Sequence, residues 1–130
     1  MIRTFNPDGM AAPASNYSQG ASVPAGARWL HISGQVGASA DGTVRDGFEA
    51  QLEQCFDNLI DVLKADGMDV SDLVKITVFA VPHGPECVAA YREIRDRYMG
   101  SHKPAATFLG SVSLASDGLL VEVEAVAAKA

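Results

Sequence analysis

The most constraining feature of the chain is an apolar segment, Leu73 to Val81, that runs directly into a proline. Its residues are mostly β-branched or aromatic, a composition that favours a strand buried on both faces of a sheet. Pro82 lacks the backbone N–H that a continuing ladder would need, so the strand is expected to end there. The other elements must therefore pack around this central strand.

Two further segments carry the periodicity of amphipathic helices. Over Gly47 to Ala65, apolar residues recur at spacings of three and four, and Asp66-Gly67 is typical of a helix end. A second helix is predicted from about Pro85 to Met99. We expect its apolar line to be Cys87, Tyr91, Ile94 and Tyr98, and its solvated side to carry Glu86, Arg92, Glu93, Arg95 and Asp96.

Five other segments read as strands, which makes six with the central one: Met1–Phe5, Ser18–Val23, Arg28–Val36, Ala105–Leu114 and Leu119–Ala127. The turn-forming tripeptide Pro24-Ala25-Gly26 predicts a hairpin between the second and third of the six. Because each helix has a single apolar stripe, both are expected on one face of the sheet. The predicted fold is α+β, a mixed six-stranded sheet with two helices on one face.

The last predicted strand alternates in a way that assigns its two faces. One set of residues is expected beneath the helices: Leu119, Val121, Val123, Ala125 and Ala127. The other set is Leu120, Glu122, Glu124 and Val126, which is too apolar to be simply solvated. This uncovered face predicts an oligomer in which subunits cover it and clefts between them hold a ligand.

Composition excludes several classes of protein. With 130 residues, 48% of them apolar, the chain is expected to form one domain over 1–130. Its net charge of -6 argues against nucleic-acid and anionic-membrane partners. The sequence shows no signal peptide and no apolar run long enough to span a membrane. Its two cysteines, Cys55 and Cys87, cannot build a disulfide framework. We therefore expect a cytoplasmic protein.

The three histidines, His31, His83 and His102, have no metal-ligand spacing, so no metal is assigned. No glycine-rich phosphate loop, nucleophile elbow or dinucleotide fingerprint is present either. Cys87 falls in the first turn of the second helix, where a thiol is activated by the helix dipole, but its apolar neighbours favour a core thiol.

Three local patterns carry chemistry, and each has a simpler structural interpretation. Glu122 and Glu124 share a strand face, where two neighbouring carboxyl groups suit proton transfer, although alternating glutamates are also typical of a solvated face. Tyr17-Ser18-Gln19-Gly20 offers a phenol and hydroxyls beside a glycine, and Ser33-Gly34-Gln35-Val36 offers close backbone approach. Ordinary turn chemistry explains either tetrapeptide alone.

Taken together, five blocks of the chain resemble the RidA/YjgF family of reactive-intermediate deaminases, in the family's order. They are Tyr17–Gly20, Ser33–Val36, Val74–Phe79, Pro104–Thr107 and Val121–Ala127. The resemblance implies a fold like that of the small chorismate mutases, in a homotrimer with a central barrel and three ligand clefts between subunits. It also implies hydrolysis of small-molecule enamines and imines to ammonia and a 2-keto acid without a metal or organic cofactor.

The resemblance also assigns roles to individual residues. Glu124 matches the glutamate that activates water, Tyr17 the tyrosine that lines the pocket and Gly34 the glycine beside the ligand. In the block that ends at Thr107, Ala106 stands where the family has an arginine that holds the substrate carboxylate, and Phe108 occupies a position whose backbone amide helps bind the ligand.

Alanine cannot supply the paired charge-assisted hydrogen bonds of a guanidinium, so ordinary 2-imino-acid hydrolysis is not expected. His102 or Lys103 is the nearest replacement cation in sequence. The leading hypothesis is a hydrolase for a substrate without the usual carboxylate, and the alternative is a non-catalytic ligand-binding or regulatory trimer. Ribonuclease activity or inhibition of translation, found for some relatives, is disfavoured by the acidic charge and interleaved arginines.

Overall fold

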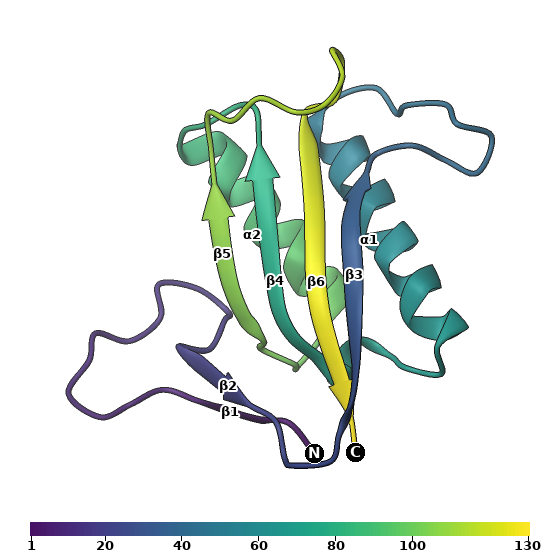
Figure 1. Ribbon diagram of the computed structural model, residues 1–130. Helices are drawn as coiled ribbons and strands as arrows, with labels where there is room; N and C mark the ends of the chain where they lie inside the picture. The colour runs from purple at the N-terminus through teal and green to yellow at the C-terminus, as the bar shows by residue number, and fades with distance from the viewer.

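The computed structural model describes residues 1–130, which form six strands, two α-helices and a short 3-10 turn. The elements are β1 (Arg3–Phe5), β2 (Gly20–Ser22), β3 (Arg28–Val36), α1 (Phe48–Ala65), η1 (Val70–Asp72), β4 (Leu73–Ala80), α2 (Pro85–Met99), β5 (Ala105–Leu109) and β6 (Val121–Lys129). Four strands form the main sheet in the order β3-β6-β4-β5 (Figure 1). Only β4 and β5 are parallel, joined by the crossover through α2, so the sheet is mixed.

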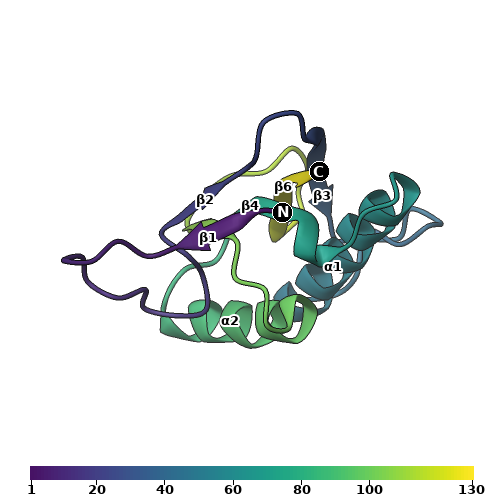
Figure 2. The same cartoon turned by 90° about the horizontal axis from the view of Figure 1, so that it is seen from below.

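Both helices lie on the same face of the main sheet, as the view from below shows (Figure 2). The predicted stripe of α1 is its buried face, where Leu52, Phe56, Leu59 and Leu63 are fully buried. The helix ends where expected, since Gly67 adopts a left-handed φ of 72° and the Met68 amide donates to the Leu63 carbonyl oxygen at 2.9 Å. The predicted α+β class, with two helices on one face, is confirmed.

The apolar core fills the space between this helical layer and the sheet. Strand β6 contributes as its alternation predicted, with Val121, Val123, Ala125 and Ala127 in the core. The central strand β4 contributes Ile76 and Val78. Because β6 lies between β3 and β4, its side chains occupy the middle of the sheet.

The predicted hairpin between the second and third strands is wrong. Strand β2 pairs with β1, and β3 pairs instead with β6. The six strands therefore form a four-stranded sheet and a separate two-stranded ribbon, not one continuous sheet. A single parallel bridge from Ser18 to Ala105 ties the chain before β2 to the edge strand β5.

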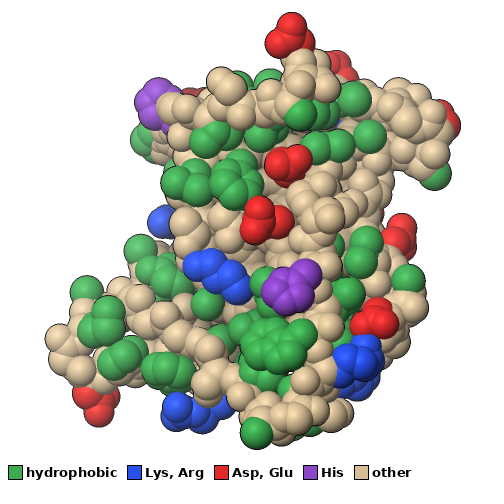
Figure 3. All heavy atoms as spheres, viewed as in Figure 1, with side chains coloured by type: hydrophobic (Ala, Val, Ile, Leu, Met, Phe, Trp, Pro, Cys, Tyr) green, Lys and Arg blue, Asp and Glu red, His purple; other side chains and the backbone are tan.

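The face of the sheet opposite the helices is uncovered. Trp29 on β3 is 50% exposed and Leu109 on β5 is 43% exposed. Figure 3 shows this face, on which apolar, acidic, basic and histidine side chains lie together over the strands. Neither helix has the length and apolar character needed to cross a lipid bilayer.

Candidate functional site

Three of the predicted site residues, Tyr17, Ala106 and Phe108, line one small cavity at the β5 edge of the sheet. The cavity has a volume of about 210 Å³. The N-terminal loop, α2 and β5 each supply part of its wall. The lining residues are Ala14, Ser15, Tyr17, Val88, Tyr91, Arg92, Arg95, Ala106 and Phe108.

Strand alternation and two tethers bring these residues together. On β5, Ala106 and Phe108 turn toward α2 and pack against the core. The Tyr91 ring of α2 lies against the Phe108 ring with their centroids 4.8 Å apart. The loop that carries Tyr17 is held on β5 by Ser18, whose amide donates to the Pro104 carbonyl oxygen at 3.1 Å. The side-chain hydroxyl of Ser18 also donates to the backbone oxygen of Lys103.

The structure corrects the prediction that Arg95 lies on the solvated side of α2. Its side chain is only 2% exposed. The Nε atom donates to Asp96 Oδ1 at 3.0 Å, and Nη1 donates to Ser15 Oγ at 3.2 Å. The Nη2 atom lies 3.0 Å from the same Asp96 oxygen, but it makes no hydrogen bond and is buried. The physical reason for this burial is that Arg95 follows Tyr91 by four residues, so both occupy the same helix face.

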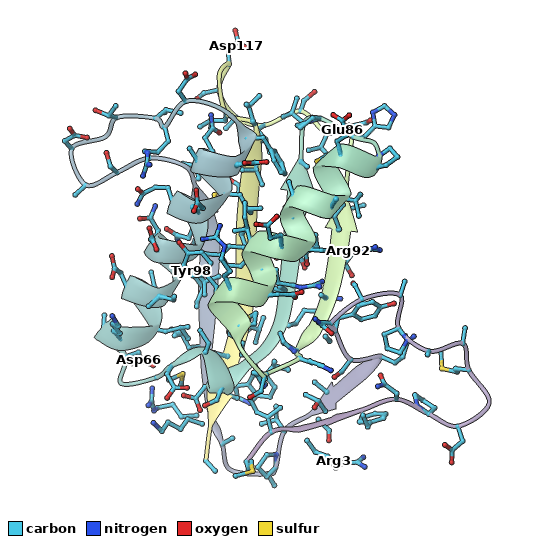
Figure 4. All side chains as sticks on the ribbon, turned by 180° about the vertical axis from the view of Figure 1, so that it is seen from behind. Arg3, Asp66, Glu86, Arg92, Tyr98 and Asp117 are labelled. Carbon is cyan, nitrogen blue, oxygen red and sulfur yellow. The ribbon has the colours of Figure 1, made fainter.

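Cationic side chains nevertheless line the pocket beside Ala106. Arg95 and Arg92 both line it, and Figure 4 shows Arg92 extending from α2 over β5. His102 is engaged elsewhere, since its Nε2 lies 2.7 Å from the Leu73 carbonyl oxygen. Lys103 is exposed and does not line the cavity.

The other predicted site residues lie on the open face of the sheet. Glu124 on β6 is opposite Thr77 on β4, and Thr77 is in turn opposite Thr107 on β5. Both Glu124 and Thr107 are exposed, and Lys75 donates to Thr107 Oγ1 at 2.7 Å. A polar row thus crosses three strands on the face that the helices leave free.

Gly34 lies beside Glu122 and not beside Glu124. A Cβ atom at Gly34 would be 2.6 Å from Glu122 Cδ, so the carboxyl group rests directly on the glycine. Glu122 is half-buried, whereas Glu124 is exposed. The sequence indicates both glutamates, and the structure distinguishes them by this contact and by their burial.

Gly34 and the pocket residues of β5 thus fall at the two opposite edges of one sheet, while the glutamates lie on the interior strand β6. Gly34 is on the edge strand β3, and Ala106 and Phe108 are on the edge strand β5, with β6 and β4 between them (Figure 1). No Asp, Glu or His side chain lines the cavity beside Ala106. Within one chain, the pocket and the glutamates are separate groups.

A larger cavity of about 630 Å³ lies between the beginnings of α1 and α2 and contains Cys87. Burial raises the pKa of the Cys87 thiol, and its Sγ lies 3.7 Å from the Pro82 carbonyl oxygen. Burial and the charge of Glu122 raise the pKa of the Cys55 thiol to about 12. Both cysteines are free and buried, which fits core thiols better than nucleophiles.

Comparison with known proteins places this geometry in a family. Residues 9–129 match the family described as Endoribonuclease L-PSP. The human protein named 2-iminobutanoate/2-iminopropanoate deaminase is 32% identical over 129 residues, which cover 98% of this chain and 88% of the human protein. A RutC family protein of Pyrococcus horikoshii is 31% identical over 90% of both chains. The crystal structure of YyfB from Yersinia pestis, described as a protein of unknown function of the conserved Rid family, is 33% identical, with a TM-score of 0.90 over 98% of both chains. The chain therefore belongs to the RidA/YjgF family.

Proposed function

We propose that this chain is a metal-free hydrolase that binds a small metabolite in clefts between the subunits of a homotrimer and hydrolyses its imine or enamine form. The observation that carries the proposal is the convergence of Tyr17, Ala106 and Phe108 on one small cavity. The deaminase name of the human relative supports the reaction class.

Assembly is supported by the incomplete site and the uncovered face. The pocket at the β5 edge has no general base, while the carboxylates of Glu122 and Glu124 lie on β6 beyond the cavity. A second copy that brings its β3 edge and open face to the first copy's β5 edge completes the site. Exposed Trp29 and Leu109 then become buried in the contact between copies.

The proposed reaction uses a carboxylate to activate water. The carboxylate takes a proton from water while the water oxygen bonds to the imine carbon, and the C=N double bond becomes a single bond as the carboxyl group passes that proton to the imine nitrogen. Proton transfer from the new hydroxyl to nitrogen then breaks the C–N bond and releases ammonia and a carbonyl product. An enamine first takes a proton on carbon to give the imine.

Two glutamates are candidates for this role. Glu124 is the residue that the family resemblance indicates, and its position on the open face leaves it accessible to a neighbouring subunit. Glu122 is supported by its contact with Gly34, the glycine expected beside the ligand. We propose that one of the two activates water and that the other tunes the charge around it.

The substrate is proposed to differ from that of the deaminases, because the strand position occupied by Ala106 supplies no guanidinium. The cations of this pocket come instead from α2. Phe108 and the Tyr91 ring add an apolar wall, which favours a substrate with an apolar side chain.

A test uses purified protein with 2-aminoacrylate and with apolar imines that lack a carboxylate, each generated in situ. We expect release of ammonia above the spontaneous rate for at least one of the apolar imines and little acceleration for 2-aminoacrylate. Glu122→Gln and Glu124→Gln are compared with Glu93→Gln, an exposed glutamate on α2 that is remote from the open face. Loss of about 100-fold or more in rate is expected from one of the first two variants and none from the third.

The alternative is a non-catalytic ligand-binding trimer, and the absence of any carboxylate in the pocket wall of a single chain favours it. Under this alternative, ligands bind and are recovered unchanged. Turnover that no glutamate substitution reduces, or no turnover of any imine, would reject the hydrolase.

A further inference from the structure

The loop that joins β1 and β2 carries Tyr17 into the pocket wall, and only a few contacts fix this loop in place. It projects from the side of the main sheet (Figure 1). Between Asn6 and Tyr17 the chain forms neither helix nor strand, and Ala14 and Asn16 are exposed. The place of Tyr17 therefore depends on a small number of hydrogen bonds.

Two neighbouring residues of α2 hold two neighbouring residues of this loop. Arg95 Nη1 donates to Ser15 Oγ at 3.2 Å, and Asn16 Nδ2 donates to Asp96 Oδ2 at 3.0 Å. The two tethers are joined, because Arg95 Nε donates to Asp96 Oδ1 at 3.0 Å. The Asp96 carboxylate thus holds the guanidinium with one oxygen and the loop with the other. No other side-chain hydrogen bond connects the loop with α2.

The Arg95 guanidinium is fixed inside the fold and is not free to bind a ligand. Its Nη2 atom is inaccessible and lies 3.0 Å from Asp96 Oδ1. Its central carbon lies 5.1 Å from the centroid of the Tyr91 ring. Because a buried guanidinium is costly unless its partners are in place, Arg95 holds Ser15 and Asp96 in defined positions. What Arg95 gives the pocket is therefore a fixed point for the loop.

The tether at Ser15 restricts where Tyr17 can lie. The Tyr17 amide donates to the Ser15 carbonyl oxygen at 3.0 Å, so a tight turn links these two residues. The next residue, Ser18, is buried and donates from its amide to the Pro104 carbonyl oxygen at 3.1 Å. With Ser15 held on α2 and Ser18 held on β5, the Tyr17 side chain between them is kept in the cavity wall.

We propose that Arg95 is a positioning residue of this site, which together with Asp96 latches the loop to α2 and so holds Tyr17 in the pocket. The proposal rests on the function proposed above and deepens it. Arg95 acts through Ser15 and Asp96, not by contact with the substrate. Without this latch, Ser18 stays on β5, but the segment before it is free to leave α2, which opens one wall of the cavity.

The first test follows Tyr17 itself by fluorine NMR of protein labelled with 3-fluorotyrosine. The chain has three tyrosines, and Tyr17→Phe identifies the resonance of Tyr17. Ser15→Ala and Arg95→Gln should each narrow this resonance and move it toward its position in the unfolded chain, while the resonance of Tyr98 keeps its place. Ser15→Thr retains the hydroxyl group and should keep the wild-type resonance.

Two control variants remove similar groups elsewhere. Arg97 is an exposed arginine of the same helix that pairs with Glu53 Oε2 at 3.1 Å. Ser116 is an exposed serine of the loop between β5 and β6. Arg97→Gln and Ser116→Ala should both leave the Tyr17 resonance unchanged.

The second test measures hydrolysis of the apolar imine that the wild-type protein accepts. Ser15→Ala and Arg95→Gln should raise KM by about 10-fold and leave kcat within about 3-fold, because the loop forms a wall of the pocket but does not supply the base. A general loss of stability would instead reduce the amount of active protein, which lowers the apparent kcat and leaves KM unchanged.

A Tyr17 resonance that stays in place in both Ser15→Ala and Arg95→Gln would overturn the proposal. So would a resonance that moves as far in Ser116→Ala. Where Arg95→Gln fails to fold, Ser15→Ala and Asn16→Ala decide, because both change the loop and leave the core intact.

Failure of this proposal and failure of the hydrolase can be told apart. A displaced Tyr17 resonance in the variants of a protein that hydrolyses no imine rejects the hydrolase and leaves the latch intact. Hydrolysis with an unchanged KM in variants whose Tyr17 has moved rejects the positioning role of Arg95 and leaves the hydrolase intact.

Discussion

Replacing Gly37 by alanine is expected to destabilise the protein, whereas the same change at Gly34 is expected to cost little. Neither glycine has a positive φ, so the difference is one of space alone. At Gly37, an added Cβ would lie 2.5 Å from Gln51 Cβ and 2.6 Å from Gln51 Cα. At Gly34, the nearest atoms are the outer side-chain atoms of Glu122, at 2.6 to 2.9 Å.

The magnitudes follow from what can move. Carbon atoms pack at about 3.5–4.0 Å, so the Gly37 variant must shift the backbone of α1 by about 1 Å. Overpacking of this kind lowers the free energy of unfolding by about 1–3 kcal/mol. Because Gly37→Ala must move a buried helix, we expect a loss at the upper end of this range, about 3 kcal/mol, which lowers Tm by about 10 °C. For Gly34→Ala, the Glu122 side chain rotates away, and the lower entropy of the unfolded chain returns about 0.4–1 kcal/mol, so the net change is near zero.

The assay is urea unfolding followed by far-ultraviolet circular dichroism, at one protein concentration because the stability of the proposed trimer would depend on it. Gly34→Ala should keep the stability of the wild type but displace the Glu122 carboxylate, so any hydrolysis that depends on Glu122 falls while the fold persists. A Gly37→Ala protein within about 0.5 kcal/mol of wild type would refute the packing argument, as would an equally large loss in Gly34→Ala.

Two further predictions concern polar groups of α1 and α2. Gln51→Leu should cost about 3 kcal/mol, because the buried Gln51 amide donates to the carbonyl oxygens of Arg45 and Gly118, each at 3.0 Å, and accepts from the Leu120 amide at 2.8 Å. Faster hydrogen exchange at Leu120 would report the lost bond, and a cost below about 1 kcal/mol would contradict this account. Burial and the hydrogen bond to Asp57 raise the pKa of Tyr98 from 10.0 to about 12. The neutral Tyr98 phenol therefore contributes stability that is complete below pH 10 and is lost as the pH rises toward about 12. In a titration followed by phenolate absorbance, Tyr98 should ionise in a late step that is missing in Tyr98→Phe.

Patterns confined to one element were predictable from the sequence, because burial acts directly on their spacing. The limits of α2, Pro85 to Met99, and the alternation of β6 follow from a period of 3.6 and a period of 2. Strand partners were harder to predict. Pro24-Ala25-Gly26 does turn the chain, but a turn does not determine which strands pair, and β3 finds its partner about 90 residues away.

The candidate site shows the same limit at the level of single side chains. The charge of Arg95 predicts that it faces solvent, although its spacing of four residues from Tyr91 puts it on the buried face of α2. Its partners, Ser15 and the cavity beside Ala106, come from segments distant in sequence. The contact of Glu122 with Gly34 likewise depends on the register of β3 against β6, which no local pattern specifies.

The place of β6 between β3 and β4 determines when this molecule can become stable during synthesis. Until residues 121–129 leave the ribosome, β3 and β4 have no common neighbour and the helices have no finished surface beneath them. A chain that lacks these residues leaves the facing edges of β3 and β4 unpaired, and exposed edges of this kind are prone to association. A stall late in translation would expose more apolar surface than one early in it.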